Sequence, residues 1–144
     1  MNTKTDRSKY LLAAVIFVAV LSATIYDYVQ QGAVLDQIID TQNQRIVLIR
    51  VHGLQIEDHH SLVLITDALA RSERFRRRQG GCITYTPMEV MLEDKKIILG
   101  VSQQQFQNGL VLQLDPDYLS PCLEGSLILN RYLNAAITSA LAQP

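Results

Sequence analysis

The sequence predicts an α+β protein in which an N-terminal transmembrane helix is followed by a small domain with helices packed on a mainly antiparallel sheet. Residues 10–26 are apolar and uncharged, later helical and strand-like segments are grouped rather than strictly alternating, and Asn108-Gly109 is typical of a tight hairpin turn. The chain has 144 residues, which leaves room for one small domain beyond the N-terminal run.

The N-terminal run has the composition of a membrane anchor. Residues 10–26 read YLLAAVIFVAVLSATIY, and a helix of this length reaches about 25 Å, close to the ~30 Å thickness of a bilayer's hydrocarbon layer. The basic residues of segment 1–9 precede it, so the positive-inside rule puts the N-terminus in the cytoplasm and the domain outside. A cleaved secretory signal is the alternative, for which residues 21–23 are the nearest approach to a cleavage site.

We therefore expect four segments: a basic cytoplasmic tail at 1–9, a transmembrane anchor at 10–28, a helical stalk at 29–44 and an extracytoplasmic α+β domain at 45–144. The apolar spacing of the stalk favours packing on the domain, because a coiled coil needs three or four heptads. Compactness and the lack of an N-x-S/T acceptor site indicate a bacterial protein, single-pass in the inner membrane, with a periplasmic domain.

The first half of the domain is expected to hold one strand and one helix. Residues 45–51 are rich in β-branched side chains and precede Gly53, which is typical of a buried strand. Asp58 and Ser61 offer N-cap oxygens for a helix that ends at Gly80-Gly81, with arginines in its last turns matching the helix dipole.

The second half is expected to hold a three-strand meander and a final helix. Strands are predicted at 83–92, where Pro87 indicates an edge or a bulge, at 97–107 and at 110–114. Asn108 and Gly109 would form the type I′ turn between the last two strands. The final helix is predicted at 126–141, with an apolar stripe formed by Leu129, Leu133, Ile137 and Leu141.

The densest basic patch is the predicted partner-binding site. Guanidinium groups pair well with carboxylates and phosphates, so an acidic partner or a lipid headgroup could dock there. A solvated helix end is the competing interpretation of the same run. The patch consists of Arg71, Arg74, Arg76, Arg77 and Arg78.

Histidines and carboxylates gather at the predicted start of the same helix. His52, His59 and His60, with Glu57 and Asp58, are the right residue types for zinc or acid–base chemistry. The i, i+4 spacing of H-E-x-x-H is missing, so the three histidines are only weak metal candidates and a polar helix start explains the cluster. We expect no metal and no catalytic residues.

The net charge and the absence of catalytic motifs reduce the number of function classes that fit the sequence. The whole chain has a formal net charge of −1 and residues 1–9 have a net charge of +2, which leaves −3 for the remainder. A negative net charge argues against nucleic acid as a partner. Neither G-x-S-x-G nor a phosphate-binding glycine loop occurs. We expect a non-enzymatic accessory or assembly subunit of an envelope complex, with the membrane and other membrane or periplasmic proteins as partners and no cofactor. A tethered ligand-binding or sensing domain is the alternative, and an enzyme comes third.

Cys82 and Cys122 are the only cysteines, and in an extracytoplasmic domain they can form a disulfide. The bridge would close a loop of about 40 residues and stabilise the domain by very roughly 3–4 kcal/mol in the chain-entropy model. Two free buried thiols are the alternative, whereas C-x-x-C redox chemistry lacks its spacing.

We predict that protein taken from its native compartment carries the Cys82–Cys122 bridge. Alkylation without prior reduction should leave the mass of the intact chain unchanged, and alkylation after reduction should add two labels. Two labels without reduction would contradict the prediction.

Overall fold

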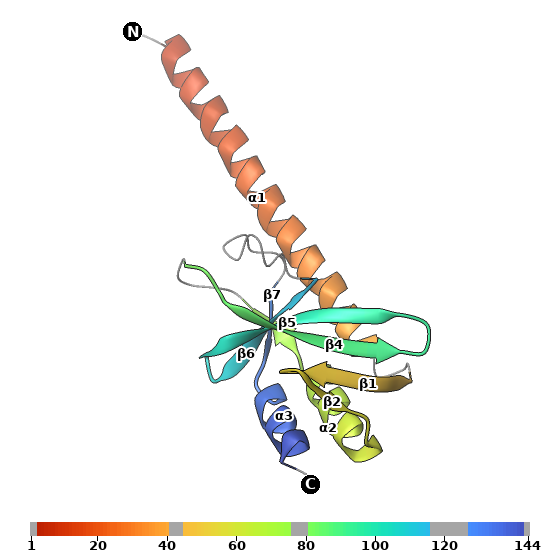
Figure 1. Ribbon diagram of the computed structural model, residues 1–144. Coiled ribbons are helices and arrows are strands. Elements are labelled where there is room, and N and C mark those ends of the chain that lie inside the picture. Colours follow the sequence, from red (N-terminus) through yellow and green to blue (C-terminus); the bar gives the residue numbers. More distant parts are fainter. Residues whose placement is uncertain (1–2, 41–44, 76–80, 116–126, 143–144) are drawn as a thin grey trace. The chain divides into compact units, whose positions relative to one another are not determined.

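The computed structural model describes residues 3–40, 45–75, 81–115 and 127–142 (Figure 1). The chain divides into two compact units, Met1–Gln30 and Gln31–Pro144. The elements in chain order are α1 (Thr3–Asp40), β1 (Ile46–Val51), β2 (Leu54–Ile56), α2 (His59–Ala70), β3 (Glu73–Arg74), β4 (Tyr85–Leu92), β5 (Lys96–Phe106), β6 (Gly109–Leu114), β7 (Leu127–Asn130) and α3 (Leu133–Leu141).

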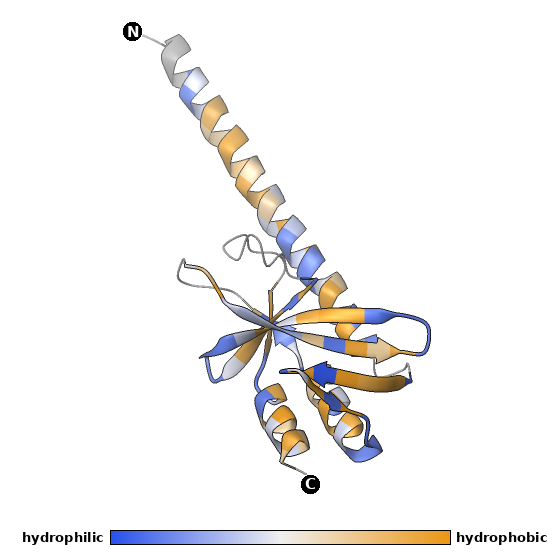
Figure 2. Ribbon diagram, viewed as in Figure 1, coloured by the Kyte–Doolittle hydropathy of each residue, from blue (hydrophilic) through white to orange (hydrophobic). Residues whose placement is uncertain are grey.

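The first unit is the greater part of α1. Large apolar side chains cover it and are exposed in the structure, among them Tyr10, Leu11 and Phe17 at 76%, 70% and 69%. Figure 2 shows an orange stretch along α1, followed by hydrophilic residues further along the helix. The helix is long and apolar enough to cross a membrane, a property that anchors and signal sequences share.

The second unit is a seven-stranded sheet with helices on one face, so the α+β prediction is confirmed. Its strand order is β2-β1-β4-β5-β6-β7-β3, and every pairing is antiparallel. Alternate side chains of the central strands meet α2 and α3 in the main core, which includes Ile49, Ile65, Met88, Leu112 and Leu133. A smaller cluster covers part of the opposite face, formed by Phe75, Ile83, Val111, Leu127 and Leu129.

The last three turns of α1 belong to the domain. Ile38 is buried in the main core, and the Gln31 amide donates a 2.9 Å hydrogen bond to the Phe75 carbonyl. A Cβ on Gly32 would lie 2.8 Å from the Arg74 guanidinium, so glycine allows this close approach. This segment therefore covers the edge of the sheet at β3. The apolar spacing favoured packing on the domain, and Val34, Leu35 and Ile38 do pack on the main core. The second compact unit begins at Gln31.

The helix expected to reach Gly80-Gly81 ends much earlier. α2 stops at Ala70, and Glu73 and Arg74 pair with Leu129 and Ile128 of β7 as a short edge strand. The prediction of a basic last turn is wrong, because tertiary pairing with β7 competes successfully with continuation of the helix. Phe75, which lies within the range predicted as helix, is buried instead on the other face of the sheet.

A hairpin follows β1 that the sequence reasoning missed. His52 and Gly53 have φ values of 52° and 74°, the left-handed pair of a type I′ turn, and Leu54–Ile56 returns as β2. His52 is therefore a turn residue. β1 is also exposed at Val47, so it is not the fully buried strand that was expected.

The β5–β6 hairpin was found, but its turn lies one residue earlier than predicted. Gln107 and Asn108 are the two residues with positive φ, and Phe106 pairs with Gly109. Gly109 is buried, and a Cβ there would lie 2.9 Å from the Asn130 carbonyl oxygen. Its glycine is needed for close strand packing rather than for the turn.

Pro87 does not mark an edge strand, because β4 lies between β1 and β5. The last β1–β4 pair is Val51 with Met88, so Pro87 lies just beyond the end of β1, where β4 has a single neighbour. A residue without an N–H is tolerated in such a position. The β4–β5 register is continuous through it.

The segment predicted as one helix at 126–141 contains a strand before the helix. Residues 127–130 form β7, buried on both faces, and only Leu133–Leu141 is helical. A short, uniformly apolar run fits a central strand as well as a helix, which is why periodicity misassigned it. Leu133 and Ile137 are core residues as expected.

Asn130 joins three elements at the end of β7. It is fully buried, and its amide nitrogen donates to the carbonyl of Ala68 and to the hydroxyl of Ser72 at 2.6 and 2.9 Å. Its side-chain oxygen accepts from the backbone N–H groups of Tyr132 and Leu133 at 2.9 and 2.7 Å, which caps the start of α3. The end of α2, the last strand and the last helix thus share one amide group.

We predict that Asn130→Ala lowers the free energy of unfolding by roughly 3 kcal/mol or more, since it removes four hydrogen bonds and leaves buried partners unsatisfied. Chemical denaturation followed by circular dichroism measures it. Asn134→Ala, on the exposed face of α3, is the matched control and should change stability by no more than about 0.5 kcal/mol. Equal effects of the two substitutions would show that Asn130 has no special role.

Candidate functional site

A β-bulge in β1 turns Val47 outward. Ile46 pairs with Leu92 and Leu48 with Met91, so Val47 is one extra residue opposite β4. Strict alternation would point Val47 toward the helices, whereas with the bulge Ile46 packs on the main core and Val47 is 51% exposed. Bulges often re-aim a side chain beside a functional site.

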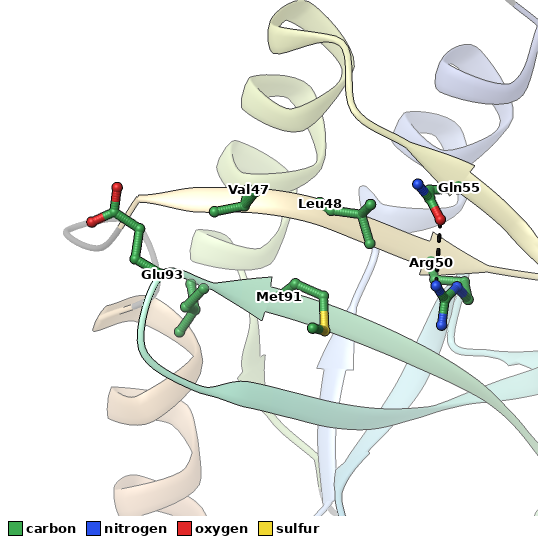
Figure 3. A pocket seen from close by; sticks show the side chains of 7 residues that line it. Val47, Leu48, Arg50, Gln55, Met91 and Glu93 are labelled. Carbon is green, nitrogen blue, oxygen red and sulfur yellow. Dashed lines mark hydrogen bonds between the residues drawn. The ribbon is translucent and has the colours of Figure 1, made fainter.

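The bulge lies in a shallow apolar groove on the face of the sheet opposite α2 and α3, which we call the outer-face groove. Its floor is apolar, and Glu93 and Arg50 lie at opposite ends of the groove (Figure 3). The groove is open to solvent along its length. It is lined by Val47, Leu48, Arg50, Gln55, Met91, Leu92 and Glu93.

Hydrogen bonds fix the side chain of Arg50 at its end of the groove. One terminal nitrogen of its guanidinium lies 3.0 Å from a Glu89 carboxylate oxygen, and the other donates to the Gln55 side-chain oxygen at 3.3 Å. Lys96 approaches the second oxygen of Glu89 at 3.5 Å. Gln55, Arg50, Glu89 and Lys96 thus form a polar line across β2, β1, β4 and β5. The side chain of Arg50 is 51% exposed and has further N–H donors.

The other end of the groove carries an exposed ion pair. Arg45 lies 3.3 Å from Glu93, and their side chains are 81% and 61% exposed. Pairs this exposed contribute little to stability, so an incoming charge can replace Arg45 at Glu93 at small cost. A second open hollow adjoins this end, at the sheet edge beside the start of α2, and is lined by Arg45, Ile46, Val47, Glu57, His59, Leu62 and Glu93.

The cluster at the start of α2 is a helix cap. Asp58 accepts a 2.8 Å hydrogen bond from the Ser61 N–H, and this bond lowers the pKa of the Asp58 carboxyl below its ordinary value. His59 and His60 occupy the exposed first turn, and His52 lies in the β1–β2 turn. In the described part of the chain, no three His, Cys, Asp or Glu side chains come together in a way that could hold a metal ion.

The arginines predicted to form one patch occupy different settings. Arg71 is the C-cap of α2, and its guanidinium lies 5.0 Å from the centre of the Tyr132 ring, in a cation–π contact. Arg74 is in β3 beside Gly32. Arg76, Arg77 and Arg78 lie outside the described residues, so a joint patch stays a prediction.

The predicted disulfide also stays a prediction. Cys82 is exposed just before β4 and is not a free thiol. Its expected partner, Cys122, lies outside the described residues.

Comparison of the chain with protein-family models, curated proteins and solved structures finds no match. Its function must therefore be inferred from its own surface.

The outer-face groove was missed by the sequence reasoning, although a signal was present. Residues 46–48 are three consecutive apolar residues, Ile-Val-Leu, and a strand with one solvated face can bury only alternate ones. One of them must face solvent or sit in a bulge. Chemically, the groove offers an apolar floor with a cation at one end and an anion at the other, which suits contact with a protein surface.

Proposed function

We propose that the chain is a single-pass protein of a bacterial inner membrane, N-terminus in the cytoplasm and domain in the periplasm. The observation that carries the proposal is the apolar surface of α1, whose large side chains from Tyr10 to Val29 are exposed. Soluble monomers rarely expose contiguous apolar patches above roughly 300–600 Å². A lipid bilayer covers such a surface, and the charged residues before Tyr10 favour the orientation.

We further propose that the protein is a non-enzymatic accessory or assembly subunit of an envelope protein complex, acting through its domain. The outer-face groove supports this role, because it presents apolar side chains to solvent between two charged ends. Its open form suits a protein surface better than a small ligand, which is usually enclosed on most sides. The lowered pKa of Asp58 has a structural cause in its helix cap and needs no catalytic explanation.

The topology prediction is N-in and C-out. A C-terminal alkaline phosphatase fusion, active only outside the cytoplasm, should be active and membrane-bound after alkaline extraction. A cytoplasm-dependent reporter at the same position should be inactive. The reverse pattern would contradict the proposed location, and release of the domain from membranes would indicate cleavage of the N-terminal helix.

The association prediction concerns the complex. A tagged full-length chain purified from gently solubilised membranes should retain a fixed set of envelope proteins. A tagged fragment holding only residues 1–30 should not retain them, because the contacts belong to the domain, which begins at Gln31. If the full-length chain purifies without other proteins, or the fragment retains the same set, the proposed role is wrong.

A further inference from the structure

The order of groups along the outer-face groove has a consequence for its partner. Arg50 lies at one end, Val47, Leu48 and Met91 form the apolar middle, and Glu93 lies at the other end (Figure 3). Residues 46 to 50 of β1 span this row, and about 3.3 Å per residue places its charged ends roughly 13 Å apart. Along this row, the order of groups is therefore a cation, an apolar stretch and an anion.

We infer that the outer-face groove is the contact between two copies of this chain related by a twofold axis. An axis in the plane of the contact and perpendicular to the row reverses the row on itself. It brings Arg50 of each copy against Glu93 of the other and stacks the two apolar middles. Such an isologous contact is the commonest form of homo-oligomer interface, and here the same residues supply both halves of the charge complementarity.

Both charged ends are able to make the new contacts. Arg50 uses one donor on Glu89 and one on Gln55 and has further N–H groups for a carboxylate. Glu93 pairs with Arg45 at an exposed position, where the second copy's Arg50 can replace that arginine. Each new pairing would be partly shielded by the apolar middle, where an ion pair is stronger than at an open surface.

Val47 supplies the apolar part of the contact. The bulge makes it the most exposed side chain of the groove's apolar middle, since Leu48 and Met91 are half-buried. Seated beside Leu48 and Met91 of a second copy, it would leave the solvent. Met is an adaptable contact residue, which suits a site that must fit its own copy.

This inference rests on the proposed role of the groove as a protein-contact surface. A different partner protein would need a matching anion and cation on its own surface, whereas a second copy brings them. The proposed anchor also holds copies in one membrane, which raises their effective concentration.

The test uses the full-length chain, released from mild detergent and weighed by native mass spectrometry over a concentration series. The wild type should be a dimer. Val47→Glu should raise the dimer dissociation constant by at least about tenfold, because it places two like charges in the apolar middle. Val63→Glu, an exposed valine on α2 with 41% exposure, is the matched control and should leave the dimer unchanged.

A charge-reversal pair gives a sharper readout. Glu93→Arg alone should favour the monomer, because the introduced guanidinium would meet Arg50 of the second copy. Arg50→Glu alone should do the same, because the introduced carboxylate would meet Glu93 of the second copy. In an equal mixture of the two variants, each contact of the heterodimer joins a guanidinium of the Glu93→Arg chain to a carboxylate of the Arg50→Glu chain, so mixing should restore a dimer as a heterodimer. The double variant Arg50→Glu with Glu93→Arg restores opposite charges at both contacts and should dimerise again.

Thermal unfolding checks that each variant folds. If Arg50→Glu or the double variant does not fold, the Val47→Glu and Glu93→Arg results decide whether the outer-face groove is the dimer contact.

Two outcomes would overturn the inference. One is a monomeric wild type, including one with another protein bound in the groove. The other is a dimer that Val47→Glu and Glu93→Arg leave intact, which would locate the contact elsewhere. Neither outcome bears on membrane attachment or on the retained envelope proteins, so the proposed function can stand or fall separately.

Discussion

The buried amide of Asn130 is the constraint on which the arrangement of the domain depends. It ties the end of α2 to the last strand through Ala68 and Ser72, and it caps α3 through the N–H groups of Tyr132 and Leu133. An apolar residue there would leave the N–H groups of Tyr132 and Leu133 without this acceptor, while the Ala68 carbonyl and the Ser72 hydroxyl would each lose one of two partners. This one side chain therefore links the end of α2 to the start of α3.

The sequence predicted the fold class and the strands of the central meander, but not the ends of the sheet. The strand patterns of β4, β5 and β6 are long enough to be recognised. By contrast, β2 and β3 have only three and two residues, and they form strands because a neighbouring strand pairs with them. β7 is too short and too uniformly apolar for its period to be read. The cap at Asp58 was found because its chemistry is local. The role of Asn130 could not be predicted, because its partners Ala68 and Ser72 are 62 and 58 residues away in sequence.

The two edges of the sheet are protected in different ways. β3 is covered by the end of α1, through the Gln31 bond to Phe75 and the approach of Arg74 to Gly32. Near the other edge, β2 pairs with only half of β1, and the bulge at Val47 interrupts the ladder there. A bulge discourages unselective strand addition at a sheet edge. The outer-face groove beside it, with a cation at one end and an anion at the other, is the surface that we propose as the protein contact. The groove was missed from sequence because its residues come from β1, β2 and β4, and only the folded register brings them together.

The sharing of α1 between the two units bears on how the protein could be processed. Ile38 and Gln31 are built into the domain, while the nearest approach to a signal-peptidase site is at residues 21–23. A cut there would remove the most apolar turns and leave the segment that the core requires. If the chain is anchored as we propose, such a cut would release the domain together with the part of α1 that packs in its core.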